Sequence, residues 1–419
     1  MISSEIYYNN LQKKYSRRIN LDRKRILKVL EKLKFPHLNL NNPINVIGSD
    51  GKFTTSINLI SFLEANKKNT TFFSSPHLIS LPQRFRLKTK FISLNQIKKY
   101  ERIIYNTGLK LTLFEALTMI YLLAANDQKK IDYNICEAGA GFEKDSTNLW
   151  DEPKAQIITN INLQHQDLFG VKTLKEVIKI KVGYLSKKTN IYIGKQTPKV
   201  LKEIKRILKN NPSKVIYPSY WRIIKNKGQY FYKDKKNIIP IKSKYIHSKG
   251  LLDNLGLSIK IALDFKVKPS IIQKTIPKIN YEGRIQYIKK GKLRNHLQKN
   301  EQLLLDGAHS KTSAKNLYDY LKGTKLPLYC VWAMQRNKFP KEFLKEFKGI
   351  FKKIVTVKIP GEPNSCTADE FKSIAIKQDY KTQTADGIKE ALKNVSSKEK
   401  KIIVVMGSLY WCGSVLKEN

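Results

Sequence analysis

The sequence has few cysteines, and they stand far apart. Its 419 residues include only 4 of them. Thiols so few and so scattered exclude a disulfide scaffold and a zinc site built on cysteine pairs, so we expect reduced thiols in the core. They are Cys136, Cys330, Cys366 and Cys412.

Long apolar runs are also missing. The longest apolar segment, 113–125, is interrupted by Glu115 and Thr118, and no run approaches the ~20 residues needed to cross a bilayer. The segment 1–18 is polar and broken by charges, unlike a signal peptide. We therefore expect a buried helix at 113–125, no membrane partner and a cytoplasmic location.

Acidic residues are scarce relative to basic ones, with 34 Asp and Glu against 79 Lys and Arg and a formal net charge of +45. The lysines are spread along the whole chain and accompanied by abundant Ile, Asn and Tyr, the drift expected from A/T-biased coding. Lys-rich stretches such as 202–209 and 233–236 predict solvated surface, so we do not expect nucleic acid as a partner. Such a field should still attract phosphate-bearing ligands at low salt.

A glycine-punctuated turn follows an apolar strand at 44–47 and precedes an amphipathic helix that we expect from about Thr54 to Ala65. Its backbone N–H groups and the helix dipole can hold a phosphate, its lysine can reach the outer phosphates, and the Thr54 hydroxyl can bind Mg2+. The usual P-loop has a further glycine upstream, and the pattern also occurs in ordinary loops, so this stretch alone leaves both interpretations open. The turn consists of Gly48, Ser49, Asp50, Gly51 and Lys52.

Further strands deliver polar side chains to their carboxyl ends. A strand at 70–74 leads into the loop 75–78, a strand at 133–136 delivers Glu137, and a strand at 156–160 delivers Asn162 and His165. Ligands collect at this edge of an open parallel sheet. A carboxylate and an imidazole at the tips of neighbouring strands can converge on a metal beside a nucleotide.

Other elements follow from periodicity and capping signals. We expect helices at 22–33, 173–185, 253–263 and 269–277, and one that a Thr112–Glu115 capping box begins. After 281 the alternation of strands and helices restarts, with strands at 302–305, 328–332, 354–358 and 401–406. This predicts a second α/β domain of about 135 residues.

Several short motifs recur in a fixed order along nearly the whole chain. They lie at 48–54, 75–78, 114–118, 137–141, 145–148, 161–170, 181–183, 283–284, 305–309 and 407–410. In this order they resemble the folylpolyglutamate synthase and dihydrofolate synthase family, within the Mur ligase superfamily. The resemblance implies a Mur-ligase-like α/β fold, with a P-loop ATPase domain at 1–281 and a smaller Rossmann-like C-terminal ligase domain at 282–419.

The resemblance also implies an ATP-dependent amide ligase. ATP would phosphorylate a carboxylate of dihydropteroate or folate, and the amine of L-glutamate would attack the acyl phosphate. ATP would lie against the turn 48–52 and Thr54, with Arg284 and Asp306 near the phosphates and ribose and Asn254 near the base. Catalytic roles would fall to Lys52, His165, Lys181, Arg284 and His309.

By the same resemblance, Mg2+ would be bound by Thr54, Ser75, Glu137 and His165. Lys181 would occupy a position that the family carbamylates. The acceptor would lie near His77, Arg84 and Phe114, the least specific part of the assignment. We expect a monomer.

Each of these residues also has an ordinary structural interpretation. Without its motif, Lys181 would be a solvated helix lysine and His165 a surface histidine. Glu115 would be a helix cap, and Asp306 could cap the helix that follows it.

The chain departs from the family motifs at positions close to the expected substrates. Phe53 replaces a loop glycine, Phe142 and Glu143 replace Gly-Arg, Gln83 replaces a glutamate and Ser310 replaces an asparagine. These changes leave two alternatives: a Mur-type ligase for another acid or amine, and a turnover-impaired paralogue that binds nucleotide or nucleic acid. The sequence does not decide between dihydrofolate synthase and folylpolyglutamate synthase activity, or the glutamate number and linkage.

Overall fold

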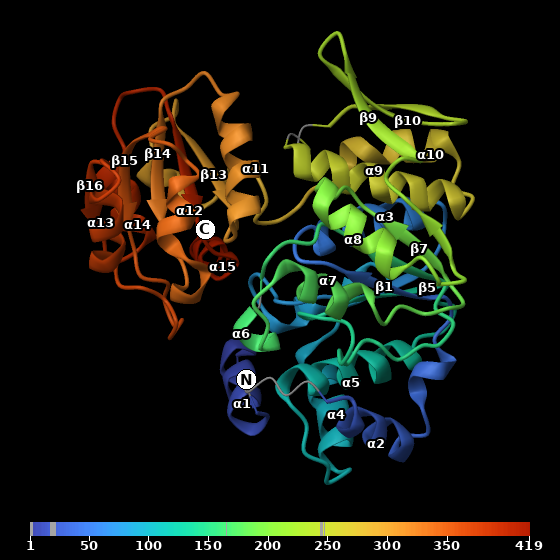
Figure 1. Cartoon of the computed structure of the whole chain (residues 1–419). Coiled ribbons are helices and arrows are strands. Elements are labelled where there is room, and N and C mark those ends of the chain that lie inside the picture. Colours follow the sequence, from blue (N-terminus) through green and yellow to red (C-terminus); the bar gives the residue numbers. More distant parts are fainter. Residues whose placement is uncertain (1–2, 17–21, 165, 244–245, 247) are drawn as a thin grey trace. The chain divides into compact units, whose positions relative to one another are not determined.

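The chain is divided into two compact units. The computed structural model describes residues 3–16, 22–164, 166–243, 246 and 248–419. One unit consists of Met1–Ser243 and Leu251–Ile279, and the other of Lys244–Gly250 and Asn280–Asn419. Both are α/β structures (Figure 1).

An eight-stranded sheet forms the centre of the first unit, in the order β4-β3-β2-β5-β1-β6-β7-β8. All strands from β2 to β8 in that order are parallel, whereas β3 and β4 add an antiparallel edge. The predicted mostly parallel sheet is therefore confirmed. The strands are β1 Pro43–Ile47, β2 Thr70–Phe73, β3 Phe85–Leu87, β4 Lys90–Phe91, β5 Tyr133–Glu137, β6 Ala155–Ile158, β7 Asn190–Ile193 and β8 Lys214–Ile216.

Consecutive strands of the large sheet are not always neighbours, as the simplest prediction from the strand–helix–strand pattern would have them. β1 and β2 are joined by helix α3, Lys52–Ala65, but β5 lies between them. For the same reason β5 and β6 are not neighbours, because each pairs with a different edge of β1. The polar residues that follow these two strands thus lie on either side of the turn after β1.

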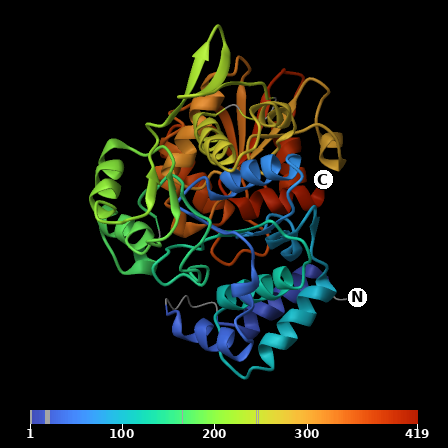
Figure 2. The ribbon, with the colours of Figure 1, turned by 90° about the vertical axis from the view of Figure 1, so that its right-hand side faces the viewer.

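Four helices of the first unit pack together beside the large sheet. α1 Ser4–Lys14, α2 Lys24–Lys32, α4 Leu94–Tyr105 and α5 Leu113–Asn126 share one apolar core with Phe73 and Phe85. Figures 1 and 2 show these helices gathered on the same side of the large sheet. The other helices are α3, α6 Gln166–Phe169, α7 Leu174–Val182, α8 Pro198–Ile207, α9 Lys249–Asp264 and α10 Pro269–Thr275.

Capping explains where several of these helices begin. The predicted capping box is confirmed: the Thr112 hydroxyl accepts a hydrogen bond from Glu115 N, and the Glu115 carboxylate accepts one from Thr112 N. α7 begins after a second such box at Thr173 and ends at Val182, before the predicted Leu185. The sequence prediction omitted α1, α4, α6 and α8.

A small antiparallel sheet lies where the sequence suggested only short strands and basic loops. It consists of β9 Trp221–Asn226, β10 Gln229–Asp234 and β11 Ile238–Ile241. Figure 1 shows β9 and β10 as a projecting ribbon. A Cβ atom on Gly256 of α9 would clash with Trp221, so this close approach seats the ribbon on the helix.

The second unit has a six-stranded sheet in the order β12-β13-β17-β14-β15-β16, parallel except for β12. This confirms the predicted second α/β fold. Its strands are β12 Gln286–Ile288, β13 Gln302–Asp306, β14 Leu328–Trp332, β15 Phe351–Thr356, β16 Thr382–Thr384 and β17 Ile402–Met406. Its helices are α11 Lys311–Lys322, α12 Pro340–Lys345, α13 Ala368–Ile376, α14 Ile388–Val395 and α15 Leu409–Glu418.

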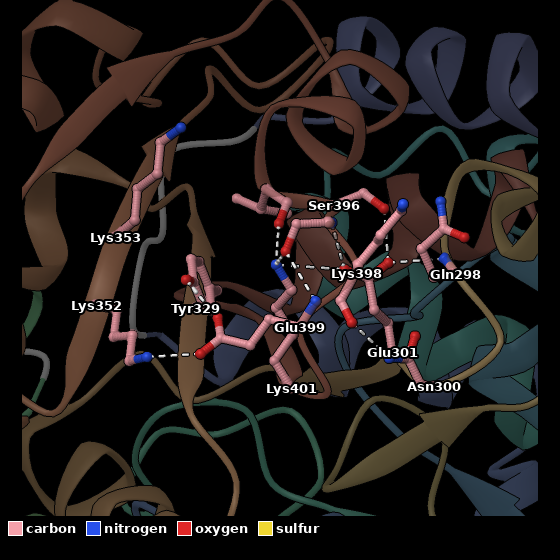
Figure 3. A network of polar contacts seen from close by, with 12 residues as sticks. Gln298, Asn300, Glu301, Tyr329, Lys352, Lys353, Ser396, Lys398, Glu399 and Lys401 are labelled. Atoms are coloured by element: carbon pink, nitrogen blue, oxygen red, sulfur yellow. Dashed lines mark hydrogen bonds and ion pairs between the residues drawn. The ribbon is translucent and has the colours of Figure 1, made fainter.

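A buried ion pair ties the beginnings of β13 and β17 together (Figure 3). Glu301 and Lys401 lie 3.4 Å apart, and their side chains are 0% and 1% exposed. The Lys401 amine also donates to Val395 O and the Ser397 hydroxyl, at 2.6 Å each. These bonds offset part of the cost of burying two charges.

All four cysteines are buried and free, as predicted. Among the described residues, no helix is both long enough and apolar enough to span a bilayer.

Candidate functional site

The carboxyl ends of four strands bring the predicted polar loops to one edge of the large sheet. Along that edge the strands stand in the order β2, β5, β1 and β6. The loop that begins at Ser74 follows β2, Glu137 ends β5, the turn 48–51 follows β1, and the segment 159–164 follows β6. Adjacent strands are ~4.8 Å apart, so this row can hold an extended ligand.

The turn after β1 has the conformation of an anion-binding loop. Gly51 precedes α3 with φ +90, and a Cβ atom there would stand 2.7 Å from the Asn254 amide. Only glycine takes this left-handed conformation without strain. The backbone N–H groups of Ser49 and Asp50 donate to Asn160 O at 2.8 and 3.2 Å, which fixes the turn against the segment after β6.

Lys52 is the first residue of α3, and its amine lies over the turn. Its Nζ donates to Gly48 O at 3.1 Å and to Ser49 O at 3.4 Å, and stands 3.9 Å from Glu137 Oε1. Glu137 is 4% exposed. The structure thus brings together the two predicted residues with the clearest phosphate and metal chemistry.

Asn254 comes from α9, far along the chain, and contacts the same turn. Its Nδ2 donates to the Thr54 hydroxyl at 2.8 Å, and that hydroxyl donates to Gly51 O at 3.1 Å. The structure therefore places Asn254 against the beginning of α3. Its expected place near a base stays a prediction.

Lys181 is fully buried, which contradicts its interpretation as a solvated helix lysine. It is 1% exposed, and its Nζ donates to Gly48 O at 3.1 Å and also to Ala140 O. Burial, reinforced by the positive charge of Lys52, lowers the pKa of Lys181 to about 7. An amine with such a pKa is partly uncharged at neutral pH.

Asp145 supports this arrangement, although the sequence gave it no role. It accepts hydrogen bonds from Gly139 N at 2.9 Å and from the N–H and hydroxyl of Thr147 at 3.0 and 2.7 Å. Burial raises the pKa of Asp145. Its place in the motif 145–148 could have singled it out in the sequence. Its hydrogen bond with Gly139 is visible only in the folded chain.

His165 lies outside the described residues, so its predicted metal and catalytic roles stay predictions. Asn162 of the same segment binds the turn after β1. Its Nδ2 donates to Asp50 Oδ2 at 2.6 Å, and its backbone N–H donates to the Ser49 hydroxyl at 3.1 Å.

The predicted acceptor residues lie on the loop after β2 and at the beginning of α5. Arg84 Nε donates to His77 Nδ1 at 2.9 Å, and Ser75 is half-buried at the beginning of the loop. Phe114 packs against Phe73, with ring centroids 5.7 Å apart. A Cβ atom on Gly139 would stand 2.9 Å from the Phe114 ring, so that ring covers the loop after β5.

The departures from the family motifs have local structural explanations. Phe53 packs on Phe72 of β2, at 6.1 Å between ring centroids. Phe142 is 0% exposed and belongs to the core under α7 and α8, whereas the Glu143 N–H donates to Ile180 O at 3.1 Å. Gln83 Oε1 accepts from the backbone N–H groups of 78, 79 and 80, which shapes the loop after β2.

Arg284, Asp306 and His309 lie in the second unit. The Asp306 carboxylate accepts from the N–H groups of Ile285 and Ala308, at 2.9 and 2.8 Å, so it does not cap α11. Burial raises the pKa of Asp306, against the opposing charge of Arg284. The cap is Ser310, whose hydroxyl accepts from Ser313 N at 3.2 Å, and His309 Nδ1 lies 2.8 Å from Gly307 O.

Comparison with known proteins identifies this arrangement of motifs. A family model described as "Dihydrofolate synthetase, C-terminal domain" matches residues 289–418. The dihydrofolate synthetase of Saccharomyces cerevisiae is 24% identical over 428 residues, spanning 95% of this chain and 98% of its own length. Over most of its length the chain is therefore similar to proteins of the folylpolyglutamate and dihydrofolate synthase family.

Solved structures of this family have the same fold. A bifunctional folylpolyglutamate synthase/dihydrofolate synthase from Yersinia pestis, complexed with AMPPNP and Mn ion, has a TM-score of 0.85 and 20% identity, and covers 100% of this chain and 98% of its own. E. coli FolC in complex with DHPP and ADP has a TM-score of 0.84 and 20% identity, covering 99% and 97%. At this identity the likeness concerns the fold.

A nucleotide and a divalent metal fit the residues present in this folylpolyglutamate and dihydrofolate synthase fold. The left-handed Gly51, the beginning of α3 and the Lys52 amine form a phosphate cradle. Mg2+ is usually bound through one or two carboxylates together with substrate phosphates. Glu137 and the hydroxyls of Thr54 and Ser75 are donors of that kind.

Proposed function

We propose that the protein is an ATP-dependent ligase that joins L-glutamate to the carboxylate of dihydropteroate or of a folate. The observation that carries this proposal is the arrangement of Lys52, Glu137 and Lys181 around the turn after β1. A phosphate cradle beside a carboxylate and a second lysine suits phosphoryl transfer from ATP. The family and its ordered motifs support the choice of substrates.

In this proposal the chain binds and orients the phosphates of ATP. Lys52 leaves the Gly48 and Ser49 carbonyls and stabilises the charge that builds on the transferring phosphoryl group. Glu137, Thr54, Ser75 and His165 would hold Mg2+, which would supply positive charge against the phosphates of ATP. The acceptor carboxylate takes the phosphoryl group, and the amine of glutamate then displaces phosphate to form the amide, leaving ADP and phosphate.

Lys181 is proposed to act as a carbamate. Its partly uncharged amine can add to CO2 and release a proton, which replaces a buried cation by an anionic oxygen donor. The low pKa of about 7 supports this proposal, because only the free amine reacts. The proposed roles of Arg284, Asp306 and His309 are to bind the phosphates and ribose of ATP.

The acceptor is proposed to lie along the loop after β2. Phe114 offers an aromatic face beside the loop after β5, and the pair of Arg84 and His77 offers polar groups. β2 is two strands from β1, a separation of about 10 Å. This spacing suits an acceptor whose aromatic part lies at one end of the row and whose carboxylate reaches the phosphates at the other.

The experiment is a turnover assay with defined acceptors. Purified protein with ATP, Mg2+ and L-glutamate should release ADP and phosphate when dihydropteroate or tetrahydrofolate is added, and mass spectrometry should find the acceptor heavier by one or more glutamates. Omission of glutamate is the control. If no acceptor raises phosphate release above the background, the proposed function is wrong. A monomeric state and a cytoplasmic location stay predictions.

A further inference from the structure

Arg84 is a buried cation whose hydrogen-bond partners carry no charge. Its side chain belongs to the buried set, at 5% exposed, and its two side-chain hydrogen bonds go to His77 Nδ1 and to the Tyr8 hydroxyl. Among the residues that the structure describes, no carboxylate forms an ion pair with this guanidinium. A buried charge without a counter-ion is costly. The arrangement is therefore suited to receive electron-rich oxygen atoms from a ligand.

Tyr8, on α1, holds both members of this pair. Arg84 Nη2 donates to the Tyr8 hydroxyl at 3.2 Å, and the guanidinium carbon stands 5.4 Å from the centre of the Tyr8 ring. The same ring meets the His77 ring edge to face, with centroids 4.7 Å apart and planes at 85°. One side chain thus fixes the orientation of the guanidinium and of the imidazole.

These contacts also decide the protonation of His77. Because Arg84 Nε donates to His77 Nδ1 at 2.9 Å, Nδ1 acts as an acceptor and the ring is neutral with its proton on Nε2. The Tyr8 hydroxyl accepts from Arg84, so its own proton is a hydrogen-bond donor. The cluster of Tyr8, His77 and Arg84 therefore offers N–H and O–H hydrogen-bond donors to a ligand. Tyr8 contacts both of the other two side chains and so orients them.

Helix α1 is anchored to the same loop at a second point. The Ser4 hydroxyl accepts a hydrogen bond from Leu81 N at 3.2 Å, and Leu81 begins the short helix Leu81–Arg84. α1 thus contacts the loop after β2 at Leu81 and at Arg84, from opposite ends of a single helical turn of α1. Sequence periodicity gave no sign of this helix, and none of the family motifs includes it.

We propose that Tyr8 is a positioning residue for the acid acceptor, because it holds Arg84 and His77 in the arrangement that meets the acceptor's oxygen atoms. This proposal rests on the proposed function. Tyr8 acts through Arg84 and His77, so its replacement should weaken acceptor binding and leave the phosphate chemistry at Lys52 unchanged. Replacement of a residue with a purely structural role would instead change the KM values of all three substrates alike.

The test is steady-state kinetics with Tyr8→Phe and Tyr8→Leu, each substrate being varied in turn. Tyr8→Phe keeps the ring and loses the bond to Arg84, so we expect the KM of the acid acceptor to rise roughly fivefold, and roughly twentyfold or more in Tyr8→Leu. The KM values of ATP and glutamate and the kcat should stay within about twofold, as this site lies two strands from the phosphate cradle. Tyr7→Phe is the matched control, because the neighbouring Tyr7 hydroxyl faces Glu101 at 3.5 Å instead.

The outcomes are distinguishable. An active wild-type enzyme whose acceptor KM is unchanged in Tyr8→Phe and Tyr8→Leu would overturn the role of Tyr8 and leave the proposed function intact. A fall in kcat or a rise in every KM would equally overturn it. If Tyr8→Leu fails to fold, Tyr8→Phe decides, since it retains the ring packing. An inactive wild-type protein would overturn the proposed function and this proposal together.

Discussion

Two lysines share one backbone carbonyl. The amines of Lys52 and Lys181 each lie 3.1 Å from Gly48 O, although the lysines come from two different helices, α3 and α7. A positive charge on one amine disfavours a positive charge on the other, and burial also disfavours the Lys181 cation. The two amines therefore repel each other when both are charged, and an anionic ligand such as the phosphates of ATP would reduce this repulsion.

Replacement of Lys52 should remove most of the turnover. Lys52→Ala keeps the backbone cradle and loses the cation, so we expect kcat to fall roughly a hundredfold or more, the scale of preorganised charge stabilisation. The measurement is phosphate release at saturating substrates. Lys67→Ala, at an exposed lysine beyond the end of α3, is the control and should retain full activity. A Lys52→Ala rate close to wild type would contradict the role given to this amine.

Lys181 should make stability depend on pH. Its pKa is about 7 in the folded chain against 10.5 as a model value. Between these values the unfolded state binds more protons than the folded state, so the free energy of unfolding should rise as the pH increases from 7 towards 10. Urea unfolding of wild type and Lys181→Met at pH 7 to 9 measures this, because their difference isolates the lysine from other titrating groups.

Lys181→Met should lose part of the rise in the free energy of unfolding with pH. Lys179→Met, at an exposed position of the same helix, should keep it. Lys181→Met should also lower kcat roughly a hundredfold or more. Parallel pH profiles for wild type and Lys181→Met would contradict the low pKa.

At the scale of elements, strand order determines which loops meet. β5 pairs between β1 and β2, which places Glu137 between the phosphate cradle and the loop that carries Arg84. The alternation of strands and helices predicted each element and the parallel direction. It did not predict the insertion of a strand that comes 60 residues later, because pairing partners are chosen by the packing of the whole sheet.

The ion pair at the beginnings of β13 and β17 should stabilise the second unit. Lys401→Met leaves Glu301 buried and charged, so we expect a loss of about 3–5 kcal/mol in the free energy of unfolding. Chemical unfolding followed by tryptophan fluorescence is the measurement. Lys352→Met, which removes the exposed partner of Glu399 in the same network (Figure 3), should cost less than about 1 kcal/mol. Equal losses in the two variants would contradict the importance of burial.

At the scale of the whole molecule, the charge of +45 should make stability depend on salt. Like charges repel in the compact state, and the screening length falls from about 30 Å at 0.01 M to about 8 Å at 0.15 M ionic strength. We expect Tm to rise with sodium chloride over this range, by about 2–4 °C for each 1 kcal/mol of repulsion relieved. Calorimetry without nucleotide measures it, and a Tm that stays constant or falls would show that repulsion is negligible.

The sequence by itself determined the α/β class, most strands and helices, and the ordered motifs that resemble those of the folylpolyglutamate and dihydrofolate synthase family. These depend on local signals, namely apolar periodicity, capping residues and glycines at tight turns. It missed α1, α4, α6, α8 and the sheet of β9, β10 and β11, although α8 has an amphipathic pattern with Val200 and Ile204 buried. Such elements are stabilised by the partners they pack against.

Only the tertiary structure decided the environments of the functional side chains. Lys181 looked like a solvated lysine on a helix, and the folded chain buries it against Gly48 O and Ala140 O. Asn254 of α9 donates a hydrogen bond to Thr54, and Tyr8 of α1 accepts one from Arg84. These partners are too far apart in the sequence for a local pattern to predict the contacts. Burial and partner identity arise from contacts between distant segments, and these contacts set the charge and orientation of each group.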